Sequence, residues 1–65
     1  MYQNYMRLRD ERNLSDYAVA KHTGIPQSTF TDWKSGRSTP KIEKLIKIAD
    51  FLGVSIDTLV REEAN

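Results

Sequence analysis

The sequence contains no cysteine, only two prolines and three glycines, a single histidine and no long apolar run. Without cysteine, disulfides and thiolate metal sites are impossible, which excludes the disulfide-rich secreted scaffolds. A membrane helix needs about 18 consecutive apolar residues, and the polar first ten residues lack the apolar core of a signal peptide. We therefore expect no membrane association and a cytoplasmic location.

The remaining composition is that of an ordinary small globular protein. The 65 residues are 38% hydrophobic and 29% charged, and this length allows one domain, over residues 1–65. A chain of about 60 residues buries only about 60% of the surface that it exposes when unfolded. An enzyme with its own pocket is therefore not expected, and the surface is what such a chain offers to a partner.

The net charge of +1 is unevenly distributed along the chain. Residues 1–20 hold three basic and three acidic side chains, residues 21–47 hold six basic and two acidic, a net +4, and residues 48–65 hold one basic and four acidic, a net −3. A basic segment favours an anionic partner such as nucleic acid. On charge alone, a solvated surface of mixed charge explains the pattern more simply.

The spacing of apolar residues predicts helices, and no stretch alternates as a half-buried strand would. Serines are expected as N-caps, because a serine hydroxyl accepts a hydrogen bond from a free amide of the first turn. Glycines are expected at helix ends, where a residue without Cβ adopts the left-handed conformation. Five short helices are predicted: residues 3–12, Ser15 to Gly24, Pro26 to Gly36, the segment between Pro40 and Gly53, and a last one from Ser55. The predicted fold class is therefore a compact all-α, five-helix domain.

The later helices have apolar residues on one face. The clearest set is Ile42, Leu45, Ile46, Ala49 and Leu52, at spacings i, i+3, i+4, i+7 and i+10. In the last helix, we expect Leu59 inside the core and Val60 partly at an interface.

The central feature is the segment 16–35, in which two short helices are joined by a tight turn. A helix-turn-helix has steric requirements that this segment meets. Ala20 is small where the third helix crosses the second, Gly24 makes the turn, and Ile25 fills the wedge between the helices.

The third helix is expected to have one aromatic and one polar face. Phe30 and Trp33 lie three residues apart, so both point to the core, a role that we favour over stacking on bases. At about 100° per residue, the other face carries the polar side chains of Gln27, Ser28, Thr31, Asp32 and Ser35. In a major groove, glutamine suits adenine, and an ionised aspartate accepts a hydrogen bond from cytosine. A hydrophilic surface facing solvent is the alternative.

Four motifs fall in register over residues 5–60: a small Ala, a turn Gly, a Gly-x-x-x-Pro loop and a closing Leu-Gly-Val-Ser. They are Ala20, Gly24, Gly36 to Pro40, and Leu52 to Ser55. In these motifs the chain resembles the Cro/CI-type helix-turn-helix family, the lambda-repressor-like or Xre regulators. The resemblance implies a five-helix domain, with its motif at about residues 16–35, that binds operator DNA, usually as a two-fold dimer on a palindrome.

The resemblance also implies roles for individual residues. The start of the third helix enters the major groove in that family, so the residues expected to read bases are Gln27, Ser28, Thr31 and Asp32. The start of the second helix and the loop after the third approach phosphates in that family. The residues expected at phosphates are Tyr17, Lys34, Ser35, Arg37, Ser38, Thr39 and Lys41. For Tyr17, covering the core is an equally good interpretation.

Two positions depart from the family pattern. The family often has Gln where this chain has Asp16, and an ionised Asp repels a phosphate, so Asp16 is left out of the contacts. The family often has Glu at the position of Lys34, where it pairs with an Arg that matches Arg9. Two cations cannot pair, so we expect Arg9 to find another acid or solvent, and Lys34 to face outward towards a phosphate.

Signals for chemistry are weak. His22 has no Asp, Glu or Cys at metal-ligand spacing, so we expect it at the surface of the second helix. The segment from Ser38 to Lys41 spells the Ser-x-x-Lys of some acyl-transfer enzymes, but no companion motif accompanies it. We therefore assign no catalytic residue, metal, cofactor or small-molecule substrate.

The sequence thus predicts a sequence-specific DNA-binding transcriptional regulator of a bacterium or phage, repressor-like and homodimeric, at the nucleoid. Its partner is expected to be a double-stranded operator, palindromic in sequence. A protein-interaction or antitoxin-like helical module is the alternative, favoured by the low net charge and by two acids, Asp16 and Asp32, on the DNA side. A third interpretation is that the chain is the DNA-binding part of a longer repressor.

Overall fold

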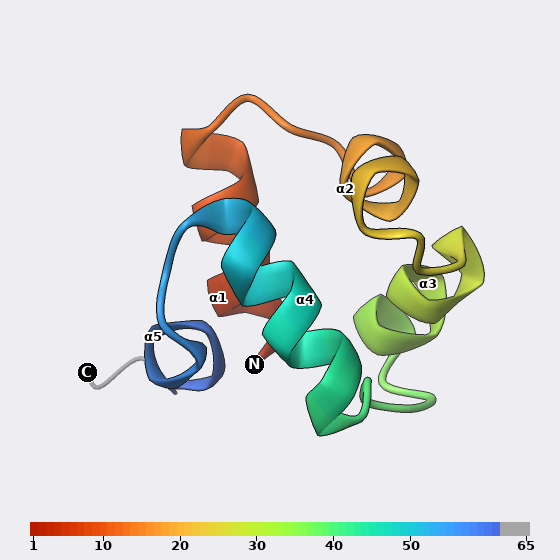
Figure 1. Cartoon of the computed structure of the whole chain (residues 1–65). Coiled ribbons are helices and arrows are strands. Elements are labelled where there is room, and N and C mark those ends of the chain that lie inside the picture. The colour runs from red at the N-terminus through yellow and green to blue at the C-terminus, as the bar shows by residue number, and fades with distance from the viewer. Residues whose placement is uncertain (62–65) are drawn as a thin grey trace.

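The computed structural model describes residues 1–61, and this part of the chain forms five helices and no strand. They are α1 (Tyr2–Glu11), α2 (Asp16–Thr23), α3 (Gln27–Ser35), α4 (Ile42–Leu52) and α5 (Ile56–Val60) (Figure 1). The predicted all-α class and the order of the helices are confirmed, with ends within one or two residues of those expected.

The helix ends have the local causes that the sequence indicates. The Ser15 hydroxyl accepts a hydrogen bond from the Ala18 amide at 3.1 Å, and the Ser55 hydroxyl accepts one from the Thr58 amide at 3.0 Å. Gly24 and Gly36 have φ angles of 76° and 82°, in the left-handed region where a residue without Cβ carries no steric penalty. These caps hold the two helices of the segment 16–35 to eight and nine residues.

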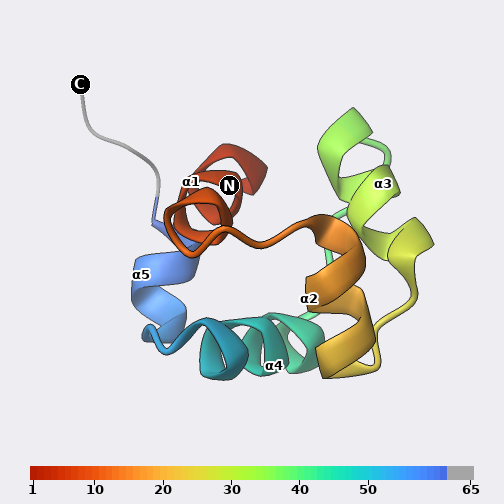
Figure 2. The same cartoon turned by 90° about the horizontal axis from the view of Figure 1, so that it is seen from above.

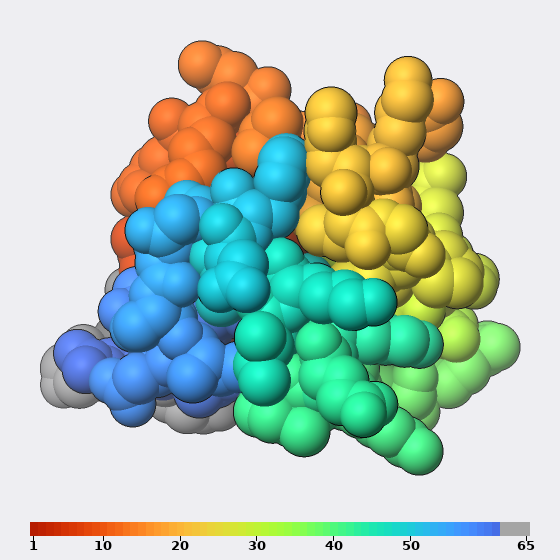
Figure 3. Space-filling model, viewed as in Figure 1, coloured from red at the N-terminus to blue at the C-terminus, as the bar shows by residue number. Residues whose placement is uncertain are grey.

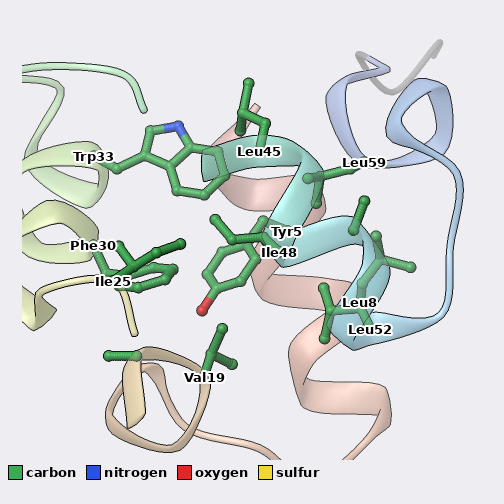
Figure 4. Packing of buried hydrophobic residues seen from close by; sticks show 12 residues of the cluster. Tyr5, Leu8, Val19, Ile25, Phe30, Trp33, Leu45, Ile48, Leu52 and Leu59 are labelled. Carbon is green, nitrogen blue, oxygen red and sulfur yellow. The ribbon is translucent and has the colours of Figure 1, made fainter. Parts of the chain in front are cut away.

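Each helix contributes one fully buried large side chain to a single core. These side chains are Tyr5, Val19, Phe30, Ile48 and Leu59 (Figure 4). Trp33 is also buried, and its ring stacks on that of Tyr5 with the centroids 5.0 Å apart. Core roles for Phe30, Trp33 and Leu59 are therefore confirmed.

The apolar face of α4 is turned relative to the prediction. Ile42 and Ile46 are 58% and 46% exposed, whereas Ile48 is fully buried. The buried set is Leu45, Ile48, Ala49 and Leu52, which has the same helical spacing but begins three residues later. Ile42 and Ile46 belong to the predicted apolar stripe but lie outside the core, because α4 packs between α2 and α5 and these neighbours cover its other flank.

The helices are arranged so that α4 crosses the molecule between α2 and α5 (Figures 1 and 2). α1 packs on α5 and α3, and α2 packs on α3 and α4. The buried Asn4 side-chain amide joins α1 to α5 by donating to the carbonyls of Thr58 and Leu59 at 2.6 and 3.0 Å. Within residues 1–61, none of the helices has the length and apolarity to cross a membrane.

Candidate nucleic-acid interface

In the α2–turn–α3 unit, α3 crosses close to α2, and one face of α3 points away from the core. The turn begins where the Gly24 amide donates to the Ala20 carbonyl at 2.9 Å. Ile25 follows it and is buried in the wedge between the helices, and the small Ala20 is buried as well, as predicted. The rings of Phe30 and Trp33 lie 5.5 and 5.0 Å from that of Tyr5. The inner face of α3 is therefore anchored to α1, and its opposite face is presented to solvent.

The outer face of α3 is polar, as the helical spacing indicates. Gln27, Ser28 and Thr31 are exposed, and Asp32 is half-buried. The Thr31 hydroxyl donates to the Gln27 carbonyl at 3.4 Å, which leaves its lone pairs free to accept. α3 lies at an edge of the molecule, and its yellow-green residues form part of the right-hand rim in Figure 3. All four expected base-reading residues thus lie on one accessible helix, and their contact with bases stays a prediction.

The loop after α3 is held against the end of that helix. The Asp32 carbonyl accepts hydrogen bonds from the amides of Arg37 and Ser38 at 2.9 and 3.3 Å, and the Ser35 hydroxyl accepts one from the Arg37 amide at 3.4 Å. The Arg37 guanidinium lies 4.0 Å from the Asp32 carboxylate. Exposed ion pairs contribute only about 0–1 kcal/mol, so this one leaves Arg37 able to bind a phosphate. The Arg37 guanidinium therefore lies beside the outer face of α3.

All of the expected phosphate contacts are exposed. They are Tyr17, Lys34, Ser35, Arg37, Ser38, Thr39 and Lys41. Tyr17 is 60% exposed, which decides against the interpretation that it covers the core. Lys34 and Thr39 both line an open groove of about 550 Å³ between the start of α1 and the end of α3. Sequence periodicity gives no signal for that groove, because its walls come from three separate segments.

Arg9 has two acidic partners. Its guanidinium lies 2.6 Å from the Asp16 carboxylate and 2.8 Å from that of Asp10. The expectation that Arg9 finds an acid other than one at position 34 is thus confirmed. The sequence did not identify Asp16 as that acid, although Tyr2, Tyr5 and Arg9 recur at i, i+3 and i+7 and share a face of α1.

The same carboxylate accepts hydrogen bonds from two tyrosines, Tyr2 at 2.8 Å and Tyr5 at 2.7 Å. Burial by itself raises the pKa of Asp16, but the hydrogen bonds from Tyr5, Arg9 and Tyr2 outweigh burial and hold this pKa below its ordinary value. Burial, followed by the hydrogen bond to Asp16, raises the pKa of Tyr5. Asp16 is therefore ionised and occupied inside the domain, which agrees with leaving it out of the phosphate contacts.

His22 lies at the surface of α2, as expected. Its ring stacks on that of Phe51 from α4, with the centroids 5.2 Å apart and the planes 14° from parallel. Among residues 1–61, no three His, Cys, Asp or Glu side chains are grouped so that they could hold a metal ion. His22 thus packs against α4.

Comparison with known proteins matches this chain to one family and to several regulators. A family model described as helix-turn-helix matches residues 6–59. The transcriptional repressor RstR of the cryptic phage CTXphi from Vibrio cholerae is 36% identical over 63 residues, which are 95% of this chain and 57% of that protein. The HTH-type transcriptional activator BcrR of Enterococcus faecalis is 30% identical over 94% of this chain and 30% of its own length.

A further relative is covered more fully. The HTH-type transcriptional regulator y4dJ of Sinorhizobium fredii is 35% identical over 57 residues, which are 88% of this chain and 74% of that protein. The chain spans about half or less of the length of RstR and BcrR. No solved structure matches the chain.

Proposed function

Because this chain belongs to the Cro/CI-type helix-turn-helix family, we propose that it is a sequence-specific DNA-binding regulator of transcription. The observation that carries the proposal is the outer face of α3. That face is polar and accessible, while the aromatic inner face is fixed on α1. A helix held in this way enters a major groove without a change of fold.

In the proposed complex, residues of the first two turns of α3 contact base edges. The Gln27 amide presents a donor and an acceptor together, which matches the N6 and N7 atoms of adenine. Ser28 and Thr31 hydroxyls form single hydrogen bonds with either type of base, and the ionised Asp32 accepts from the amino group of cytosine. These contacts select the sequence to which the domain binds.

Phosphate contacts supply much of the affinity and set the position of the domain on the duplex. The proposed cations are Lys34, Arg37 and Lys41, from the end of α3, the following loop and the residue before α4. The hydroxyls of Tyr17, Ser35, Ser38 and Thr39 add neutral hydrogen bonds from the same segments. Three cations in each protomer would neutralise about six phosphates when a homodimer binds.

We propose that the protein acts by occupying a palindromic operator as a homodimer in the cytoplasm, without a catalytic step, a cofactor or a small-molecule substrate. The names of two relatives, a repressor and an activator, describe opposite outcomes of regulation. Occupancy accounts for both, because a bound protein blocks or recruits polymerase according to where the operator lies. The structure also weakens the protein-interaction alternative, since Asp16 is occupied within the domain.

Selection of duplexes from a random-sequence pool, followed by fluorescence anisotropy with the selected operator, tests the proposal. Neutralising about six phosphates predicts an affinity loss of about 10³-fold between about 50 and 200 mM salt. We expect this loss for the operator and for random duplex, with the operator bound more tightly at each salt concentration. Failure to enrich any sequence, or equal affinity at both salt concentrations, would contradict the proposal.

A further inference from the structure

Asp16, the first residue of α2, is held by three side chains of α1. Its Oδ2 accepts from the Tyr2 hydroxyl at 2.8 Å, and its Oδ1 accepts from the Tyr5 hydroxyl at 2.7 Å and from Arg9 Nη1 at 2.6 Å. The Arg9 and Asp16 side chains are only 14% and 20% exposed. Both carboxylate oxygens of Asp16 therefore accept hydrogen bonds from α1, at the N-terminal end of α2, where the helix-turn-helix begins.

The two tyrosines also hold α3. The ring of Tyr5 stacks on Trp33 at 5.0 Å, and the ring of Tyr2 meets the edge of Trp33 at 5.4 Å. Figure 4 shows the Tyr5 ring beside Phe30 and Trp33, with its hydroxyl directed towards α2. Each tyrosine thus joins α1 to both helices of the motif, by its hydroxyl to α2 and by its ring to α3.

The contacts of Asp16 join two helices, α1 and α2, that pack mainly on other helices. α2 packs mainly on α3 and α4, and α1 packs mainly on α5 and α3. The start of α2 is attached to α1 by the linker that follows Glu11 and by the cluster around Asp16 (Figure 2). Without the hydrogen bonds of Asp16, the first turn of α2 keeps its linker but loses these side-chain contacts with α1.

From this geometry we propose that Asp16 is a positioning residue for DNA binding, which fixes the start of α2 and the α2–turn–α3 unit on α1. The inference rests on the proposed function and adds to it a residue that touches neither base nor phosphate. Tyr2, Tyr5 and Arg9 are the groups through which Asp16 acts. Fixing the unit aligns Tyr17 and the outer face of α3 for simultaneous contact with one duplex.

A positioning role for Asp16 and a purely electrostatic role predict opposite changes in DNA affinity when its charge is removed. A carboxylate near a phosphate repels it, so removing the charge of Asp16 strengthens DNA binding if charge is its only effect. If Asp16 positions the motif, its removal weakens binding to the operator despite the lost repulsion. Random duplex, which depends on charge more than on alignment, is bound equally or more tightly.

The test compares Asp16→Asn with Asp10→Asn in the full chain. Asp10 is the matched control, because it also contacts Arg9, at 2.8 Å, but is exposed and lies on α1 itself. Anisotropy is measured with the selected operator and with random duplex, at a temperature where circular dichroism shows each variant fully folded. For Asp16→Asn we expect operator affinity to fall about tenfold, the equivalent of one charge-assisted hydrogen bond, with no loss for random duplex. For Asp10→Asn we expect no loss with either.

Two further variants keep the test decisive if Asp16→Asn does not fold. Tyr2→Phe and Tyr5→Phe preserve the rings on Trp33 and remove the hydroxyl donors to Asp16, and Tyr2→Phe also removes an acceptor for Arg9 at 3.2 Å. Each variant is expected to lower operator affinity selectively. Operator affinity equal to wild type in a folded Asp16→Asn, or in both Phe variants, overturns the positioning role. Equal losses for operator and random duplex also overturn it. If the wild type itself binds no duplex, the proposed function fails instead, so the two failures are distinguished.

Discussion

At the scale of single residues, Asp10 and Asp16 show how surroundings change the effect of one chemical group. Both carboxylates contact Arg9, but the Asp10 side chain is 59% exposed and that of Asp16 is 20% exposed. Solvent screens the first pair, whereas the second is partly shielded and completed by two tyrosine hydroxyls. The hydrogen bonds from Tyr5, Arg9 and Tyr2 outweigh the effect of burial and hold the pKa of Asp16 below its ordinary value.

The lowered pKa of Asp16 predicts how stability depends on pH. The pKa of Asp16 is lower in the folded state than the ordinary 3.8, so the unfolded chain binds the proton more readily. Its stabilising contribution is therefore complete above pH 3.8 and is lost as pH falls through the lower pKa of the folded state. Urea unfolding over a series of acidic pH values measures this effect. We expect the free energy of unfolding to fall more steeply with acid in wild type than in Asp16→Asn.

Asp10→Asn serves as the control for the acid titration, because it removes a carboxylate without removing the hydrogen bonds of Asp16. Because those hydrogen bonds remain, the difference in acid slope that Asp16→Asn produces is expected to persist in the Asp10→Asn background. The same acid slope in wild type and in Asp16→Asn would show that this carboxylate has an ordinary pKa in the folded protein.

At the scale of elements, α3 and the start of α4 are expected to contribute different properties to binding. Gln27 lies in the first turn of α3 and is proposed to contact a base, and the exposed Lys41 precedes α4 and is proposed to contact a phosphate. Gln27→Ala is expected to cost about 1–3 kcal/mol at one base pair and to relax the preference there. Lys41→Ala is expected to weaken all sequences alike and to lower the salt slope by about one.

Anisotropy with a set of operators, each changed at one base pair, separates these effects. Wild type and both variants are measured against the whole set at two salt concentrations. If Gln27→Ala and Lys41→Ala weaken every operator by the same factor, the division between base-reading and phosphate-binding elements is wrong.

The helices also show which structural features a local sequence pattern can predict and which it cannot. The Ser15 cap and Gly24 set the bounds of α2, and Gly36 sets the end of α3, because each interaction is made within one turn of the helix end. The buried flank of α4 was not predictable in this way, because Ile42 and Ile46 have the same helical spacing as residues that are buried. Which flank is covered depends on α2 and α5, whose positions are not contained in the sequence of α4.

At the scale of the whole molecule, size and charge fit a small DNA-binding unit. The described domain measures 31 × 25 × 21 Å, and successive major grooves on one side of B-DNA are about 34–36 Å apart. Two copies therefore fit side by side on one face of a duplex. The net charge of +1 combines a segment of +4 with a last segment of −3, so we expect weaker binding to random DNA than for a strongly basic domain.

This size predicts the form of the operator. We expect selected operators to be palindromic, with half-sites centred about 34–36 Å apart, and to bind two chains. Light scattering of the complex measures the number of chains, and anisotropy compares the palindrome with a duplex that contains one half-site. Inserting about 5 bp between the half-sites places them on opposite faces of the duplex, so affinity should fall to that of the single half-site. Equal affinity for all three duplexes would contradict a two-fold dimer.

The sequence by itself determined the five helices, their caps, the α2–turn–α3 unit and the aromatic inner face of α3. Each of these depends on interactions between residues a few positions apart, which spacing alone can indicate. Only the tertiary structure decided the buried flank of α4, the exposure of Tyr17 and the pairing of Arg9 with Asp16. Burial and ion pairing depend on which helices lie side by side, and α1 reaches α2 and α3 only when all five helices share one core.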